Sequence, residues 1–199
     1  MKTDKILASV VALLVAAQAG LVFLSWFMSA TTGRVHSLLS AEGVRWFCSS
    51  FASMLASPIL TCLLLLSMAW GSLRGSGLLH HLNPNTHHPT PNTPSATRLA
   101  LVTLLVCVLL ILMLSVVPHA ILLSATGHLW PSPFSRALVP MVALTLIVVS
   151  AVYGRSAHIF QSFTDIVSSW TSGVSTCAPL IVLYIFIIQF YESLLYVFL

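Results

Sequence analysis

The sequence predicts an all-α integral membrane protein, a helical bundle of about five transmembrane helices with one interfacial amphipathic helix. Hydrophobic residues make up 58% of the 199 positions and charged residues only 6%, and the mean hydropathy is +1.00. Soluble domains carry roughly 25% charged residues, so lipid must be the main solvent of this chain. A helix needs about 20 apolar residues to cross a hydrocarbon core of about 30 Å, and five stretches are long enough.

The charges report on membrane orientation and exclude a nucleic-acid binder. The formal net charge is +4, and the basic residues form no cluster with interleaved aromatic residues. If the N-terminus is cytoplasmic, five basic residues lie inside and three lie outside, which favours this orientation with an external C-terminus. The inside set is Lys2, Lys5, Arg74, Arg98 and Arg155, and the outside set is Arg34, Arg45 and Arg136.

Residues 1–72 are expected to hold the first two transmembrane helices. The first covers residues 6–30, which is too long for the apolar core of a signal peptide. Ser40 is well placed as the N-cap of the next helix, with Glu42 in its first turn, where a negative charge is favourable. That helix is expected to run from Ala41 to Trp70 with a kink at Pro58.

Residues 73–97 are expected to form a flexible cytoplasmic loop, because this stretch is rich in proline, asparagine and histidine and cannot bury a core. Residues 98–199 are expected to hold the last three spans, over residues 99–117, 134–153 and 177–199. Between the last two, apolar residues recur at helical spacing among polar ones. This pattern predicts an interfacial amphipathic helix over 155–175.

Several short motifs resemble the AbgT-type p-aminobenzoyl-glutamate transporters, a bacterial inner-membrane family. Their order and spacing are similar to that family's landmarks, and together they extend over most of the chain. The motifs are LLSAEGVRWF at 38–47, GSGLL at 75–79, PSPF at 131–134, LVP at 138–140, YG at 153–154 and QF at 189–190.

The resemblance implies a transport function at a bacterial inner membrane, with p-aminobenzoyl-glutamate or a similar compound as substrate. Family members are more than twice as long and hold substrate in helical hairpins and broken helices. Their counterparts would lie between Leu79 and Arg98 and after Phe190, and we expect this sequence to lack them. The chain is therefore interpreted as incomplete as a transporter on its own, with a homo-oligomer or a separate transporter subunit as partner. The alternative is a structural or accessory scaffold that oligomerises or docks a partner chain.

Three residues are candidates for a substrate or proton pathway. Glu192 is the one acid deep in an apolar run, and Gln189 precedes it by about one turn on the same helical face. His119 follows Pro118 near a span end and titrates near physiological pH. An ordinary interfacial histidine and a surface-reaching glutamate are the competing interpretations.

Gly71 and Gly75 have the spacing that lets membrane helices pack closely, although helix termination competes as their role. No metal or cofactor is expected. The histidine pairs at 80–81 and 87–88 lack cysteine or acidic partners, and the four cysteines are widely spaced. No nucleophile motif of a hydrolase is present, so an enzyme is not expected.

Overall fold

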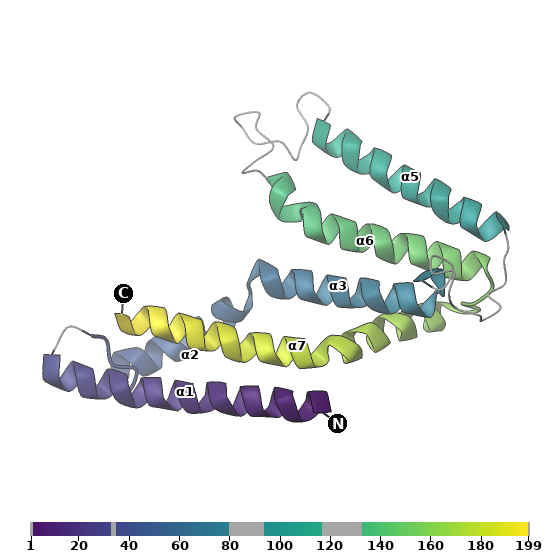
Figure 1. Ribbon diagram of the computed structural model, residues 1–199. Coiled ribbons are helices and arrows are strands. Elements are labelled where there is room, and N and C mark those ends of the chain that lie inside the picture. Colours follow the sequence, from purple (N-terminus) through teal and green to yellow (C-terminus); the bar gives the residue numbers. More distant parts are fainter. Residues whose placement is uncertain (1, 33–34, 80–93, 117–132, 199) are drawn as a thin grey trace. The chain divides into compact units, whose positions relative to one another are not determined.

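The computed structural model describes residues 2–32, 35–79, 94–116 and 133–198 (Figure 1). Every regular element in these ranges is an α-helix. The helices are α1 (Lys2–Thr32), α2 (Ala41–Leu55), α3 (Pro58–Gly75), α5 (Pro94–Val116), α6 (Pro133–Ser156) and α7 (Phe163–Phe198).

Five of these helices are long and apolar enough to cross a membrane by length and composition. They are α1, α3, α5, α6 and α7. Most of their large apolar side chains are exposed on the chain itself, as is expected where lipid surrounds a helix. The prediction of about five spans in an all-α membrane protein is therefore confirmed.

The chain divides into two compact units. The terminal unit holds residues Met1–Thr61 and Ala178–Leu199, and the central unit holds Cys62–Cys177. The dividing points lie close to prolines of two long helices, Pro58 at the start of α3 and Pro179 inside α7. Pro58 occupies the first position of its helix, where no backbone bond is lost, whereas Pro179 removes one backbone hydrogen bond inside α7.

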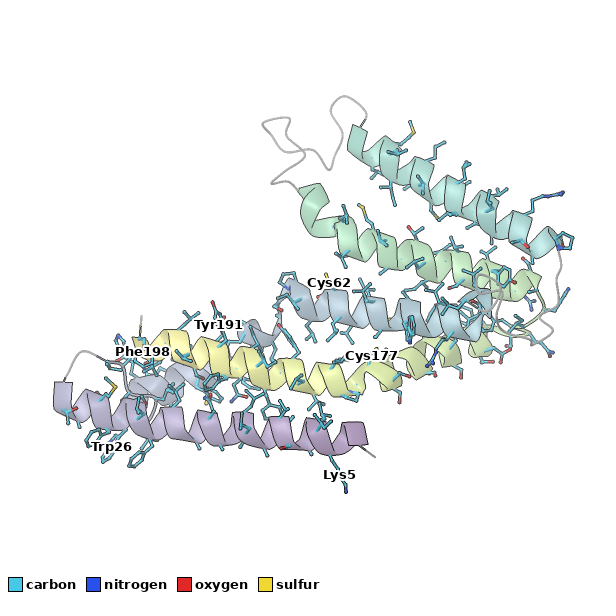
Figure 2. The ribbon with its side chains drawn as sticks, viewed as in Figure 1. Lys5, Trp26, Cys62, Cys177, Tyr191 and Phe198 are labelled. Carbon is cyan, nitrogen blue, oxygen red and sulfur yellow. The ribbon has the colours of Figure 1, made fainter. Side chains whose placement is uncertain are left out.

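The terminal unit contains α1, α2 and the second half of α7. Its core consists of Leu21, Leu38 and Val197, with Trp46 and Tyr196 packed against it. The Trp46 and Tyr196 rings stack with their centroids 4.1 Å apart. Trp26 and Tyr191 are about half exposed and project from α1 and α7 to opposite sides of this helix pair (Figure 2).

Helix α2 begins as predicted. Ser40 is its N-cap, with the side-chain oxygen accepting the Gly43 N–H at 3.0 Å, and Glu42 lies in the first turn. The expected continuous helix with a kink at Pro58 is wrong, because α2 ends at Leu55 and α3 starts at Pro58. Proline disfavours helical geometry at the residue before it and is well suited to the first helical position, so Ser57 breaks the helix.

The central unit contains α3, α5, α6 and the first half of α7, with α5 packed along α6 (Figure 1). Small side chains dominate its core: Ala69, Ala96, Ala100, Ala143 and Ala157 are all almost fully buried. Small residues let membrane helices approach closely. The van der Waals contact between them stabilises the bundle, because in lipid the hydrophobic effect does not drive helices together.

In the central unit, the boundaries of two elements differ from those that the sequence predicts. The loop predicted over 73–97 is shorter in the described residues, since Arg74 and Gly75 end α3 and Pro94 already starts α5; residues 80–93 lie outside the described ranges. The predicted helix over 155–175 is not a separate element. Residues 157–162 form a turn, and α7 runs from Phe163 into the last span, since residues 163–178 contain no proline that would end the helix.

The turn between α6 and α7 is held by side chains. His158 adopts a left-handed backbone with φ of 59°, as is common just after a helix. The Arg155 guanidinium donates to the carbonyls of Phe160 and Gln161, at 3.1 and 2.6 Å. Asp165 accepts the Gln161 and Ser162 N–H groups, each at 2.9 Å, which completes the start of α7.

Candidate functional site

A polar pair joins α1 to α7 inside the terminal unit. The Gln18 side-chain nitrogen Nε2 donates to the Ser193 hydroxyl at 2.9 Å, and Ser193 is fully buried. The other half of the amide is unsatisfied, because Gln18 Oε1 is buried and has no hydrogen-bond partner in the structure. A buried acceptor without a donor costs free energy, so such a group inside an apolar span is a candidate for ligand contact.

Two pockets lie beside this pair, and both are lined by Gln18, Gln189 and Val22. The first has a volume of about 260 Å³ and is completed by Leu38, Val44 and Phe47. The second has about 280 Å³ and is completed by Leu14, Val15, Ala19 and Phe186.

The lining of each pocket combines two amide groups with one aromatic ring and several aliphatic side chains. Pockets for drug-sized ligands measure roughly 300–1,000 Å³, so each of these has room for a fragment about the size of an aromatic ring with its substituents. The pocket residues are uncharged. The arrangement therefore suits hydrogen bonding to a neutral donor, with no general acid or base among the lining side chains.

The structure brings one of the predicted pathway residues to this site. Gln189 lines both pockets. Glu192 is half-buried next to Ser193, lines neither pocket and makes no hydrogen bond or ion pair to a described residue. His119 lies outside the described residues.

Gln18 and Ser193 were not among the residues that sequence reasoning selected. Gln18 is an amide in the middle of an apolar span, and this alone was the available signal. Its partner lies 175 residues away, so the pairing depends on how α1 and α7 pack.

A second polar contact in the terminal unit stabilises the non-helical backbone between α2 and α3. The hydroxyl groups of Ser57 and Tyr184 are hydrogen-bonded to each other, and Ser57 Oγ also accepts the Leu60 N–H at 3.4 Å. Ser57 N–H donates to the Leu55 carbonyl at 2.8 Å. Non-helical backbone at membrane depth needs such partners, so Tyr184 on α7 stabilises the break.

The central unit contains a close helix crossing at the predicted packing residues. A Cβ atom added to Gly71 would lie 2.3 Å from the Ser169 carbonyl oxygen and 2.6 Å from Gly173 Cα. At Gly75 it would lie 2.7 Å from Ser169 Cβ. The two glycines Gly71 and Gly173 therefore bring α3 and the first half of α7 into backbone contact.

The polar groups near this crossing are mostly satisfied. Ser72 on α3 and Ser150 on α6 are fully buried and share a hydrogen bond of 2.6 Å. Ser67, Ser76 and Ser169 each donate to a carbonyl of the preceding turn. The indole Nε1 of Trp170, which follows Ser169, is buried without a hydrogen-bond partner among the described residues.

No three His, Cys, Asp or Glu side chains come together as metal ligands within the described ranges. The histidine pairs at 80–81 and 87–88 lie outside those ranges. All four cysteines are free thiols.

Five helices that are long and apolar enough to cross a membrane define the class as a helical membrane protein. The family model described as "AbgT putative transporter family" matches residues 79–196, which is more than half of the chain. The chain belongs to this family of putative transporters.

A solved structure supports the same fold. The crystal structure of the Alcanivorax borkumensis YdaH transporter matches with a TM-score of 0.74 at 16% sequence identity, over 92% of this chain and 70% of that chain. At this identity the likeness concerns the fold alone. No curated protein matches the sequence.

Proposed function

We propose that this chain takes part in the transport of p-aminobenzoyl-glutamate or a related aromatic acyl-amino acid across a bacterial inner membrane. The observation that carries the proposal is the buried, unpaired Gln18 Oε1 beside two pockets lined by Gln18 and Gln189. An unpaired acceptor in an apolar span costs free energy. A ligand's N–H or O–H group that binds this oxygen during transport would remove that cost.

The pockets fit one end of such a substrate. An aromatic ring would pack against Phe47 or Phe186, and an aryl amine or amide N–H would donate to Gln18 Oε1. The carboxylates of the substrate need cationic groups or helix N-termini, and the lining side chains are neutral. The proposal therefore includes a further part of the transporter, on another chain or another copy, that binds the anionic end.

Glu192 and His119 remain predicted pathway residues. Glu192 is half-buried and directly precedes Ser193, the partner of Gln18, in the chain. We place the N-terminus in the cytoplasm and the C-terminus outside, following the distribution of the basic residues.

A scaffold function is the second candidate, and the glycine crossing of the central unit favours it. Gly71 and Gly173 form a closely packed interface of the kind that a structural helix bundle needs. In this case the terminal-unit pockets would be filled by lipid or by a helix of the partner.

Uptake of labelled p-aminobenzoyl-glutamate into proteoliposomes tests the proposal. The chain is reconstituted alone and together with membrane extract from its source, with and without sodium and proton gradients. The Gln18→Leu variant is expected to lower gradient-driven uptake about tenfold, because it removes the unpaired acceptor from both pockets and leaves only the Gln189 amide there.

Gln161→Leu is the matched control, since Gln161 is exposed in the turn between α6 and α7. Its uptake should equal that of the unchanged protein. Equal uptake by the Gln18 and Gln161 variants would remove the pocket from the pathway, and no uptake in any preparation of folded protein would favour the scaffold function.

A further inference from the structure

One end of the central unit collects basic side chains. Ala96 and Ala100 of α5 pack with Tyr153 and Ala157 of α6 and with Leu78, which follows α3. The end of α3, the start of α5, the end of α6 and the start of α7 therefore lie together, and three of these segments carry an arginine. They are Arg74 in the last turn of α3, Arg98 near the start of α5 and Arg155 in the last turn of α6.

The three arginines are exposed and their charges are not neutralised by a described residue. The guanidinium carbon of Arg74 lies 5.6 Å from the Trp70 ring centroid, which fixes the side chain without using its donors. Arg98 makes no hydrogen bond or ion pair to a described residue. Arg155 uses Nη1 for the turn, and its other nitrogens stay available.

Acidic residues are scarce at this end. Residues 43–164 contain no aspartate or glutamate. Asp165 is the nearest acid in sequence, and its Oδ2 is already occupied by two backbone N–H groups. With three arginines and one aspartate, the formal charge of these residues is three minus one, or +2.

The depth of the cluster corresponds to lipid headgroups. Arg155 and Arg136 lie nineteen residues apart on α6, or about 28 Å at 1.5 Å per residue, which is close to the thickness of the hydrocarbon core. Arg155 is thus at one membrane face when Arg136 is at the other. Trp70 lies one turn before Arg74 and is partly exposed, as is typical of the interfacial belt.

We propose that this end of the central unit, formed by Arg74, Arg98 and Arg155, binds the phosphate groups of anionic phospholipids. Guanidinium groups pair with phosphate through two parallel hydrogen bonds, and three of them lie at this end of the unit at the depth of the headgroups. The cytoplasmic leaflet supplies anionic lipid, so the contact would also fix the orientation of the protein in the membrane.

Native mass spectrometry of the full chain in uncharged detergent tests this proposal, with phosphatidylglycerol and phosphatidylcholine added in parallel. We expect preferential binding of phosphatidylglycerol. The R74Q/R98Q variant should weaken it by about fivefold for each arginine removed. Both side chains are exposed, so folding should be unchanged, and the R74K/R98K variant should retain most of the binding.

R136Q is the matched control at the opposite end of α6, and its effect should stay below twofold. A loss in R136Q as large as in R74Q/R98Q, or equal binding of the two lipids, would overturn the proposal. Displacement of the lipid by millimolar inorganic phosphate would also overturn it, because the cluster would then bind free anions and not headgroups.

Discussion

The two units of the chain differ in what surrounds an unsatisfied buried polar group. In the central unit, the indole Nε1 of Trp170 has no hydrogen-bond partner among the described residues, and Trp170 packs against a core of small and aliphatic side chains. Ser72 and Ser150 of the same unit satisfy each other. In the terminal unit, Gln18 gives one hydrogen bond to Ser193 and leaves its oxygen unpaired next to a pocket. A satisfied network rigidifies a helix interface, whereas an unsatisfied group beside a pocket retains binding capacity at a cost in stability. The pockets beside Gln18 make the terminal unit the better candidate for ligand binding.

The largest expected effect concerns the glycine crossing. In Gly173→Ala the new Cβ would lie 2.2 Å from the Ser67 carbonyl oxygen and 2.6 Å from Gly71 Cα. Both neighbours are backbone atoms, so the helices must separate, and the free energy of unfolding should fall by about 3 kcal/mol. Thermal unfolding in detergent measures it.

Gly20→Ala is the control in the terminal unit, because a Cβ there has no neighbour within 4 Å. It should leave the melting temperature unchanged or raise it, since alanine is the better helix former. Similar melting temperatures for the two variants would contradict the close crossing and weaken the contrast between the units.

The second-largest expected effect is an increase in the free energy of unfolding. Replacing both members of the terminal-unit pair, in Gln18→Leu with Ser193→Ala, removes the unpaired acceptor together with the hydrogen bond. The double variant should be more stable by about 1 kcal/mol, because the penalty for an unsatisfied buried group exceeds the net gain from one hydrogen bond. Denaturation in mixed micelles checks this.

The single variant Ser193→Ala should be less stable than the double variant, since it leaves both ends of the amide without a partner. If the double variant were destabilised instead, Gln18 would be a structural residue and not a binding one.

The smallest effect is expected for the serine pair of the central unit. A double-mutant cycle of Ser72→Ala and Ser150→Ala should give a coupling free energy of about 0.6 kcal/mol, the average for hydrogen bonds between membrane helices. Additive effects of the two substitutions would show that the serines act only as small residues that permit close packing.

Sequence reasoning predicted the features that depend on local chemistry. Apolar runs gave the spans, and Ser40 gave the start of α2. Pro58 lies where the helix is interrupted, at the position predicted for a kink. The helix ends there instead of bending, because the Ser57 hydroxyl is hydrogen-bonded to Tyr184 on α7. The Gln18–Ser193 and Gly71–Gly173 contacts join distant segments, and no local pattern specifies which helices meet.

Helix α7 has 36 residues, which corresponds to about 54 Å at 1.5 Å per residue. A bilayer measures about 40–45 Å with its headgroups, so this helix is longer than the membrane that it crosses. It must tilt or extend into water, and its polar first turns around Asp165 are the part best suited to leave the lipid. Bilayer thickness therefore sets how much of 163–170 is immersed, and the amphipathic pattern there marks the adjustable end of a spanning helix.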